Sequence, residues 1–80
     1  METNILGHRI RLARTMRGMT QVQLADAIGL AAGNGVSAIE RGLQSVSVAQ
    51  LETIARTLDV TAAQLLGETD LVVGAAKGVA

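Results

Sequence analysis

Three copies of one helix-start motif constrain the fold of this chain more than any other feature. A hydroxyl residue is followed three positions later by glutamine at Thr20 to Gln23, Ser47 to Gln50 and Thr61 to Gln64. In such a capping box the hydroxyl accepts a hydrogen bond from the backbone amide of the glutamine, which is the third helical residue. The glutamine side chain in turn accepts one from the backbone amide of the hydroxyl residue. Glycine tolerates the left-handed conformation that ends many helices. Glycines stand at the expected helix ends, at Gly18, Gly29, Gly42 and Gly67. The motifs therefore predict a series of short helices.

Five helices follow from these starts and stops: 4–17, 21–28, a short helix ending at Arg41, 48–58 and 62–66. Apolar residues recur along them at the spacing of one helical face, and no segment shows sustained strand alternation. The 80 residues contain no aromatic side chain and no cysteine, so the core must be aliphatic and no disulfide supports it. The expected fold class is all-α, a compact five-helix bundle.

The C-terminal residues differ in composition from the rest of the chain, which suggests a division into two parts. We expect residues 1–67 to form the folded domain. The remainder, 68–80, is apolar and poor in charge, and we expect it to be disordered or to dock on the bundle or on a partner protomer. Ile5, Leu12 and Met16 recur at helical spacing beside the main apolar stripe. They either extend the core or form an exposed strip suited to a partner chain.

Composition also limits the function. One histidine and scattered carboxylates do not assemble a nucleophile, a base and an orienting acid, so we expect no catalytic residue, no metal site and no cofactor. No apolar run approaches the roughly 18 residues that span a membrane, and we expect no membrane contact. The N-terminus lacks the order of a secretory signal, which predicts a cytoplasmic protein. Five arginines against three carboxylates give residues 1–42 a net charge of +2, which permits a face for a polyanion.

The order of these elements resembles the lambda-repressor-like (Cro/CI-type, XRE family) helix-turn-helix family. The similarity runs over about residues 6–66, from "LGHRIRLARTMRGMTQVQLADAIG" through "VSAIERG" to "VSVAQLETIARTLDVTAAQLL". It implies a lambda-repressor-like bundle that contains a helix-turn-helix. It also implies a sequence-specific DNA-binding transcriptional regulator, of repressor or controller type. Such a protein binds a two-fold symmetric operator on double-stranded DNA as a homodimer, through the major groove.

The resemblance assigns roles to particular residues. Alignment backward from "IERG" gives the base-facing positions as Gly33, Asn34, Ser37 and Ala38. Phosphate contacts fall on Thr20, Gln21, Arg41, Gln44 and Ser45. The arginine of the first helix and the glutamate that ends the third correspond to Arg14 and Glu40, which we expect to form a structural ion pair.

The expected recognition helix departs from the family pattern at its beginning. Seven positions separate Gly29 from Val36, where the family usually has six, so one residue is inserted. In one interpretation the helix begins near Ala32 and contains Gly33 and Gly35, at about 1 kcal/mol per interior glycine. In the other, Asn34 is the N-cap of a helix from Gly35 to Arg41. We favour the second, because asparagine is a preferred N-cap and alanine is a poor one.

A protein-interaction module with the same fold and weak or lost DNA binding is the alternative function. The glycine-rich helix start, the net charge of zero and the apolar tail favour it. A protein partner would then bind through the C-terminal tail.

Overall fold

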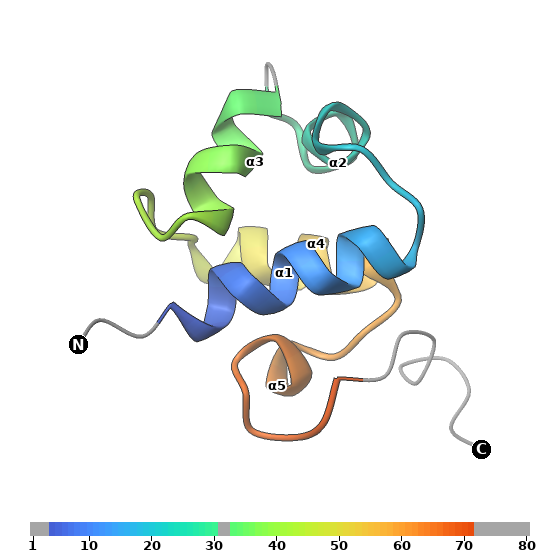
Figure 1. Cartoon of the computed structure of the whole chain (residues 1–80), viewed down its shortest axis with the longest axis vertical. Coiled ribbons are helices and arrows are strands. Elements are labelled where there is room, and N and C mark those ends of the chain that lie inside the picture. The colour runs from blue at the N-terminus through green and yellow to red at the C-terminus, as the bar shows by residue number, and fades with distance from the viewer. Residues whose placement is uncertain (1–3, 31–32, 72–80) are drawn as a thin grey trace.

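The structure, a computed structural model, describes residues 4–30 and 33–71. Within these residues it contains five helices and no strand, which confirms the all-α prediction. The helices are α1 (Ile5–Met16), α2 (Gln21–Ile28), α3 (Gly33–Glu40), α4 (Val48–Leu58) and α5 (Ala62–Leu65). In Figure 1, α2 and α3 lie together on one side of α1, and α5 lies on the opposite side. The bundle therefore presents the α2–α3 pair and α5 on different surfaces.

The helix boundaries follow the polar motifs. All three predicted capping boxes form both of their hydrogen bonds; at the first, Thr20 Oγ1 accepts from the Gln23 amide at 3.1 Å and the Thr20 amide donates to Gln23 Oε1 at 2.8 Å. The four expected glycine stops all have positive φ angles. Only α4 ends differently, at Asp59, which takes the left-handed conformation with φ 62°. Local sequence thus sets most helix ends here.

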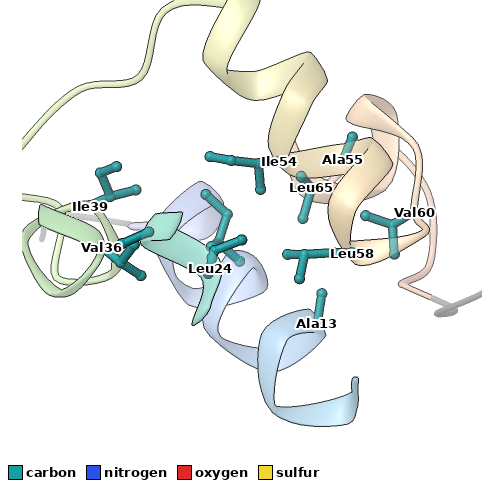
Figure 2. Packing of buried hydrophobic residues seen from close by; sticks show 11 residues of the cluster. Ala13, Leu24, Val36, Ile39, Ile54, Ala55, Leu58, Val60 and Leu65 are labelled. Carbon is teal, nitrogen blue, oxygen red and sulfur yellow. The ribbon is translucent and has the colours of Figure 1, made fainter. Parts of the chain in front are cut away.

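The core is a single aliphatic cluster to which every helix contributes (Figure 2). The long side chains of Ile10, Leu24, Ile54, Leu58 and Leu65 have at most 1% of their surface exposed. The other buried members are Ala13, Ala25, Val36, Ile39, Ala55 and Val60. Helix α3 packs mainly on α2 and α1, so these two helices set its position in the bundle.

Two apolar groups of the described residues lie outside the core. The helix expected at 62–66 ends at Leu65, and Leu66, its expected last residue, is 44% exposed. Ile5, Leu12 and Met16 are 45%, 41% and 58% exposed, so they form a solvent-facing strip on α1 and do not extend the core. These residues lie on the flank of α1, whereas the buried face of α1 is formed by other residues.

The first four residues of the expected tail, 68–71, lie against the bundle. Arg9 Nη1 donates to the carbonyl oxygens of Gln64 at 3.0 Å and Thr69 at 2.8 Å, and Leu71 packs on the core. Contacts of Thr69 and Leu71 thus hold this segment on the bundle, and the rest of the tail, 72–80, lies outside the described residues. Among the helices that the structure describes, none is long and apolar enough to cross a membrane.

Candidate nucleic-acid interface

Helices α2 and α3 form a closely packed pair, and the chain turns sharply where it leaves α2. Gly29 ends α2 in the left-handed conformation, with φ 83°, and the Leu30 amide then donates to the Ala25 carbonyl at 2.8 Å. Ala25 is 1% exposed, as expected for a small residue where two helices pack closely. This geometry, a short helix, a glycine turn and a second helix packed on the first, is that of a helix-turn-helix.

The beginning of α3 corrects the start that we favoured from the sequence. The helix includes both Gly33 and Gly35, and Asn34 is its second residue and not its N-cap. The physical reason is tertiary: a Cβ atom on Gly33 would lie 3.0 Å from Val22 Cγ2 and 3.2 Å from the Val22 backbone nitrogen. Close packing against α2 therefore favours a glycine-containing helical start that local propensity alone disfavours.

The side chains of α3 divide between two opposite faces. Gly33, Val36, Ile39 and Glu40 are buried. The outward positions follow the i, i+3, i+4, i+7 spacing of a single helical face; they are Asn34, Ser37, Ala38 and Arg41. Asn34 and Arg41 are exposed, and Ser37 and Ala38 are partly exposed. Three of the four expected base-facing residues thus share one accessible face, whereas Gly33 is buried against α2 and cannot present its surface to a base.

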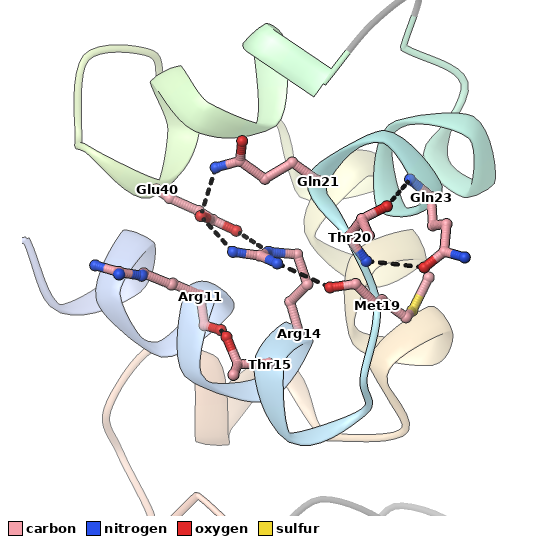
Figure 3. A network of polar contacts seen from close by, with 8 residues as sticks. All are labelled: Arg11, Arg14, Thr15, Met19, Thr20, Gln21, Gln23 and Glu40. Atoms are coloured by element: carbon pink, nitrogen blue, oxygen red, sulfur yellow. Dashed lines mark hydrogen bonds and ion pairs between the residues drawn. The ribbon is translucent and has the colours of Figure 1, made fainter.

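The buried face of α3 ends in the expected ion pair (Figure 3). Arg14 Nε lies 2.6 Å from Glu40 Oε2, and Arg14 Nη2 donates to Glu40 Oε1 at 3.2 Å. Only 14% of the Arg14 side chain and 3% of the Glu40 side chain are exposed. Arg14 also donates to the Met19 carbonyl at 2.8 Å. The pair therefore joins α1, the start of α2 and the end of α3.

Thr20 and Gln21, two expected phosphate contacts, already have intramolecular partners. The Thr20 hydroxyl caps α2, and Gln21 Nε2 donates to Glu40 Oε1 at 3.1 Å. Gln21 thus extends the ion pair into a three-residue network (Figure 3). The part of this region that remains suited to an anion is the positive end of the α2 dipole, with its backbone amides.

The other three expected phosphate contacts, Arg41, Gln44 and Ser45, are all exposed and follow the end of α3. Arg41 also lines an open hollow of about 250 Å³, whose wall includes Ser37, Gln21 and the Arg14–Glu40 pair. Arg11 of α1 completes this wall. Because Glu40 balances the charge of Arg14, the charges of Arg11 and Arg41 remain in excess. The hollow is therefore polar and has a net positive charge. No group of three or more potential metal-ligating side chains occurs in the described parts of the chain.

Comparison with known proteins identifies the family. A family model described as helix-turn-helix matches residues 10–65. The chain belongs to the XRE-type (Cro/CI-like) helix-turn-helix family. It is 37% identical over 65 residues to a Bacillus subtilis protein named as an uncharacterized HTH-type transcriptional regulator, YazB; the match covers 81% of this chain and 93% of YazB. This helix-turn-helix protein is therefore a transcriptional regulator by family.

Solved structures of helix-turn-helix regulators share the fold. The chain superposes on SinR, a master regulator of biofilm formation solved in complex with DNA, with a TM-score of 0.69, 37% identity and coverage of 76% of this chain and 97% of that one. The restriction-modification controller C.AhdI from Aeromonas hydrophila gives a TM-score of 0.69 at 35% identity, over 75% of this chain and 86% of that chain. The sequence-based expectation of a lambda-repressor-like fold is confirmed.

Sequence reasoning missed three residues that shape this helix-turn-helix protein. Arg11 lines the hollow beside Arg41, and Asn4 and Gly7 contact the end of α3. The signal for Gly7 was its position inside a predicted helix, where glycine costs about 1 kcal/mol relative to alanine and therefore suggests a packing constraint. The family resemblance singled out Arg14 among the arginines of α1, but nothing in the sequence separates Arg11 from Arg9, and only the rotation of the helix in the bundle does so.

Proposed function

We propose that this regulator binds double-stranded DNA with α3 in the major groove. In this proposal Asn34, Ser37 and Ala38 face base edges, and Arg41 leads the phosphate contacts. The observation that carries the proposal is the division of α3 into two faces: the core and the Arg14–Glu40 pair hold one, and the other presents a short polar stripe to solvent. The major groove admits an α-helix, and an asparagine amide can bond an adenine edge bidentately.

The remaining expected contacts complete this interface. We propose that Gln44, Ser45 and the backbone amides at Thr20 and Gln21 meet phosphates, with Arg11 as an additional cation. Residues 33–40 contain no lysine or arginine, so few counterions would be released on binding. With Arg11 and Arg41 as the main cations, the slope of log affinity against log salt should be shallow, about −2 per protomer.

We propose that two copies bind a two-fold symmetric operator, as a repressor or controller, in the cytoplasm. One protomer with so few contacts would gain affinity from a second half-site about one helical turn, ~34 Å, away. Sedimentation of the protein with a selected duplex should give two chains per DNA. One chain per duplex at saturation would contradict the dimeric form of the proposal without contradicting DNA binding.

Two substitutions test the interface after bound duplexes are selected from a random pool. Arg41→Ala should weaken binding to all sequences and reduce the salt slope by about 1, since one phosphate contact is lost. Asn34→Ala should change the base preferred at one position of each half-site. Arg56→Ala, which removes an exposed arginine from α4, is the matched control and should leave both properties unchanged. Equal effects of Arg41→Ala and Arg56→Ala would refute the assigned surface.

A protein-interaction module remains the second candidate, favoured by the exposed strip of Ile5, Leu12 and Met16 and by the absence of cations in α3. A related protein, SinR, has been solved in a complex with SinI, and the chain matches that SinR structure with a TM-score of 0.67 and 38% identity over 79% of this chain. Failure to retain any duplex at low salt, where electrostatic binding is strongest, would favour this function over DNA binding.

A further inference from the structure

Glu40, the last residue of α3, is held by both its side chain and its backbone. Its carboxylate accepts from Arg14 and Gln21, as described above. Its carbonyl oxygen accepts a separate hydrogen bond from Asn4 Nδ2, at 2.8 Å. Arg41 follows directly, so the residue before the proposed phosphate contact is fixed by two independent sets of bonds.

Asn4 uses the two ends of its amide for different purposes. Its oxygen accepts from the Gly7 amide at 3.2 Å and so caps the start of α1, and its nitrogen makes the bond to Glu40. Asparagine supplies a donor and an acceptor at the end of a short side chain, whereas serine, threonine and aspartate cap without offering this donor in the same place. The choice of asparagine is explained by the second bond and not by capping alone.

Two glycines leave room for this contact. A Cβ on Gly7 would lie 2.5 Å from the Ile39 carbonyl oxygen and 2.6 Å from that of Glu40, so α1 approaches the end of α3 closely. Gly42 has φ 77°, and a Cβ there would lie 2.9 Å from Asn4 Cγ. Gly7 and Gly42 therefore both lie close to the Asn4 side chain. The Asn4 amide sits between the start of α1 and the chain that leaves α3.

We propose that Asn4 is a positioning residue for DNA binding, which joins the start of α1 to the Glu40 carbonyl and so directs the chain that carries Arg41, Gln44 and Ser45. This inference rests on the proposed function. Gln44 and Ser45 line, together with Asn4 and Gly7, a hollow of about 250 Å³ beside the end of α3. Rotation of the chain at Glu40 would displace this loop from the phosphates while leaving the core in place.

Asn4→Asp separates positioning from capping. Aspartate is as good an N-cap as asparagine and its charge suits a helix N-terminus, but it has no N–H to donate and would place a carboxylate oxygen against the Glu40 carbonyl. The matched control is Ser47→Ala, which removes the cap of α4. The control should lower stability about as much as Asn4→Asp does and affect DNA binding less.

Amide hydrogen exchange in the free protein gives the first readout. The amides of Arg41, Gly42 and Leu43 donate to Ser37, Ile39 and Ala38, respectively, at 2.8–3.0 Å. In Asn4→Asp these three amides should exchange about tenfold faster, the factor expected for one lost hydrogen bond, while the α4 amides keep their rates. Unchanged exchange at residues 41–43 would refute the role of Asn4.

Affinity for a selected duplex gives the second readout. Asn4→Asp should bind about tenfold more weakly than the wild type, by the same loss of one hydrogen bond, while its thermal midpoint falls by several degrees, about as much as that of Ser47→Ala. Faster exchange with normal affinity would show that Asn4 orders the loop without positioning it for DNA, and would overturn the proposal. If the wild type retains no duplex at all, the proposed function fails first, and this inference falls with it.

Discussion

The two ends of α3 are held in place by different kinds of interaction. At its start, Gly33 and Gly35 have no side chains of their own and lie against Val22 and Leu30. At its end, Glu40 is buried and bonded to Arg14, Gln21 and Asn4. The start therefore depends on close packing and the end on directional polar bonds.

This difference shows how a helix with poor intrinsic propensity can still present a defined face. Packing at the start allows the backbone to approach α2 but does little to fix the rotation of the helix. Polar bonds at the end fix both distance and direction, because they weaken steeply when misaligned. We therefore expect substitutions at the end of α3 to have larger effects than those at its start.

The largest effect is expected for Glu40→Ala. It leaves the mostly buried Arg14 guanidinium without its carboxylate, and removing one partner of such a pair should lower the free energy of unfolding by about 3 kcal/mol. Urea denaturation measures this loss. Glu52→Ala, at an exposed position on α4, is the control and should change stability by less than about 0.5 kcal/mol. Equal losses would mean that the network does not hold the end of α3.

A smaller loss is expected for Gly7→Ala, which introduces a methyl group between α1 and the end of α3. The new Cβ would meet backbone oxygens, which cannot move aside as a side chain can. Overpacking of this kind costs about 1–3 kcal/mol, which exceeds the gain in helix propensity of about 1 kcal/mol. Thermal unfolding should show a lower midpoint. A higher midpoint would contradict the close approach of the two helices.

The smallest change, and the only gain, is expected at the start of α3, for Gly35→Ala. Its Cβ would lie 3.1 Å from Leu30 Cδ1, the end of a flexible side chain that can shift. Higher helix propensity should then raise the free energy of unfolding by about 0.5 kcal/mol, measured by urea denaturation.

Gly18→Ala is the control for this substitution, because it meets no atom within 4 Å but has φ 71°. Backbone strain alone should lower the free energy of unfolding of Gly18→Ala by about 1 kcal/mol. A loss at Gly35 as large as that at Gly18 would show that the start of α3 is as constrained as a left-handed turn.

Sequence alone predicted the features that depend on nearest neighbours along the chain. Capping boxes and glycine stops located the helices, because each is completed within about four residues. The pairing of Arg14 with Glu40 was also expected, although from family resemblance and not from spacing. The predicted N-cap at Asn34 was wrong, because the contact of Gly33 with Val22 outweighs local capping preference.

Only the tertiary structure decided which side of each helix faces which neighbour. Helical spacing left open whether Leu12 and Met16 extend the core, and the rotation of α1 in the bundle leaves them exposed. The same rotation places Arg11 in the wall of the hollow that Arg41 also lines, and it points Arg9 toward the residues after α5, where Arg9 donates to the Thr69 carbonyl. The hydrogen bond from Asn4 to the Glu40 carbonyl joins residues 36 positions apart in the sequence, so no local sequence pattern predicts it. The sequence by itself therefore determined most helix ends, because local hydrogen bonds fix them. The packing of five helices around one core determined the face that α3 presents.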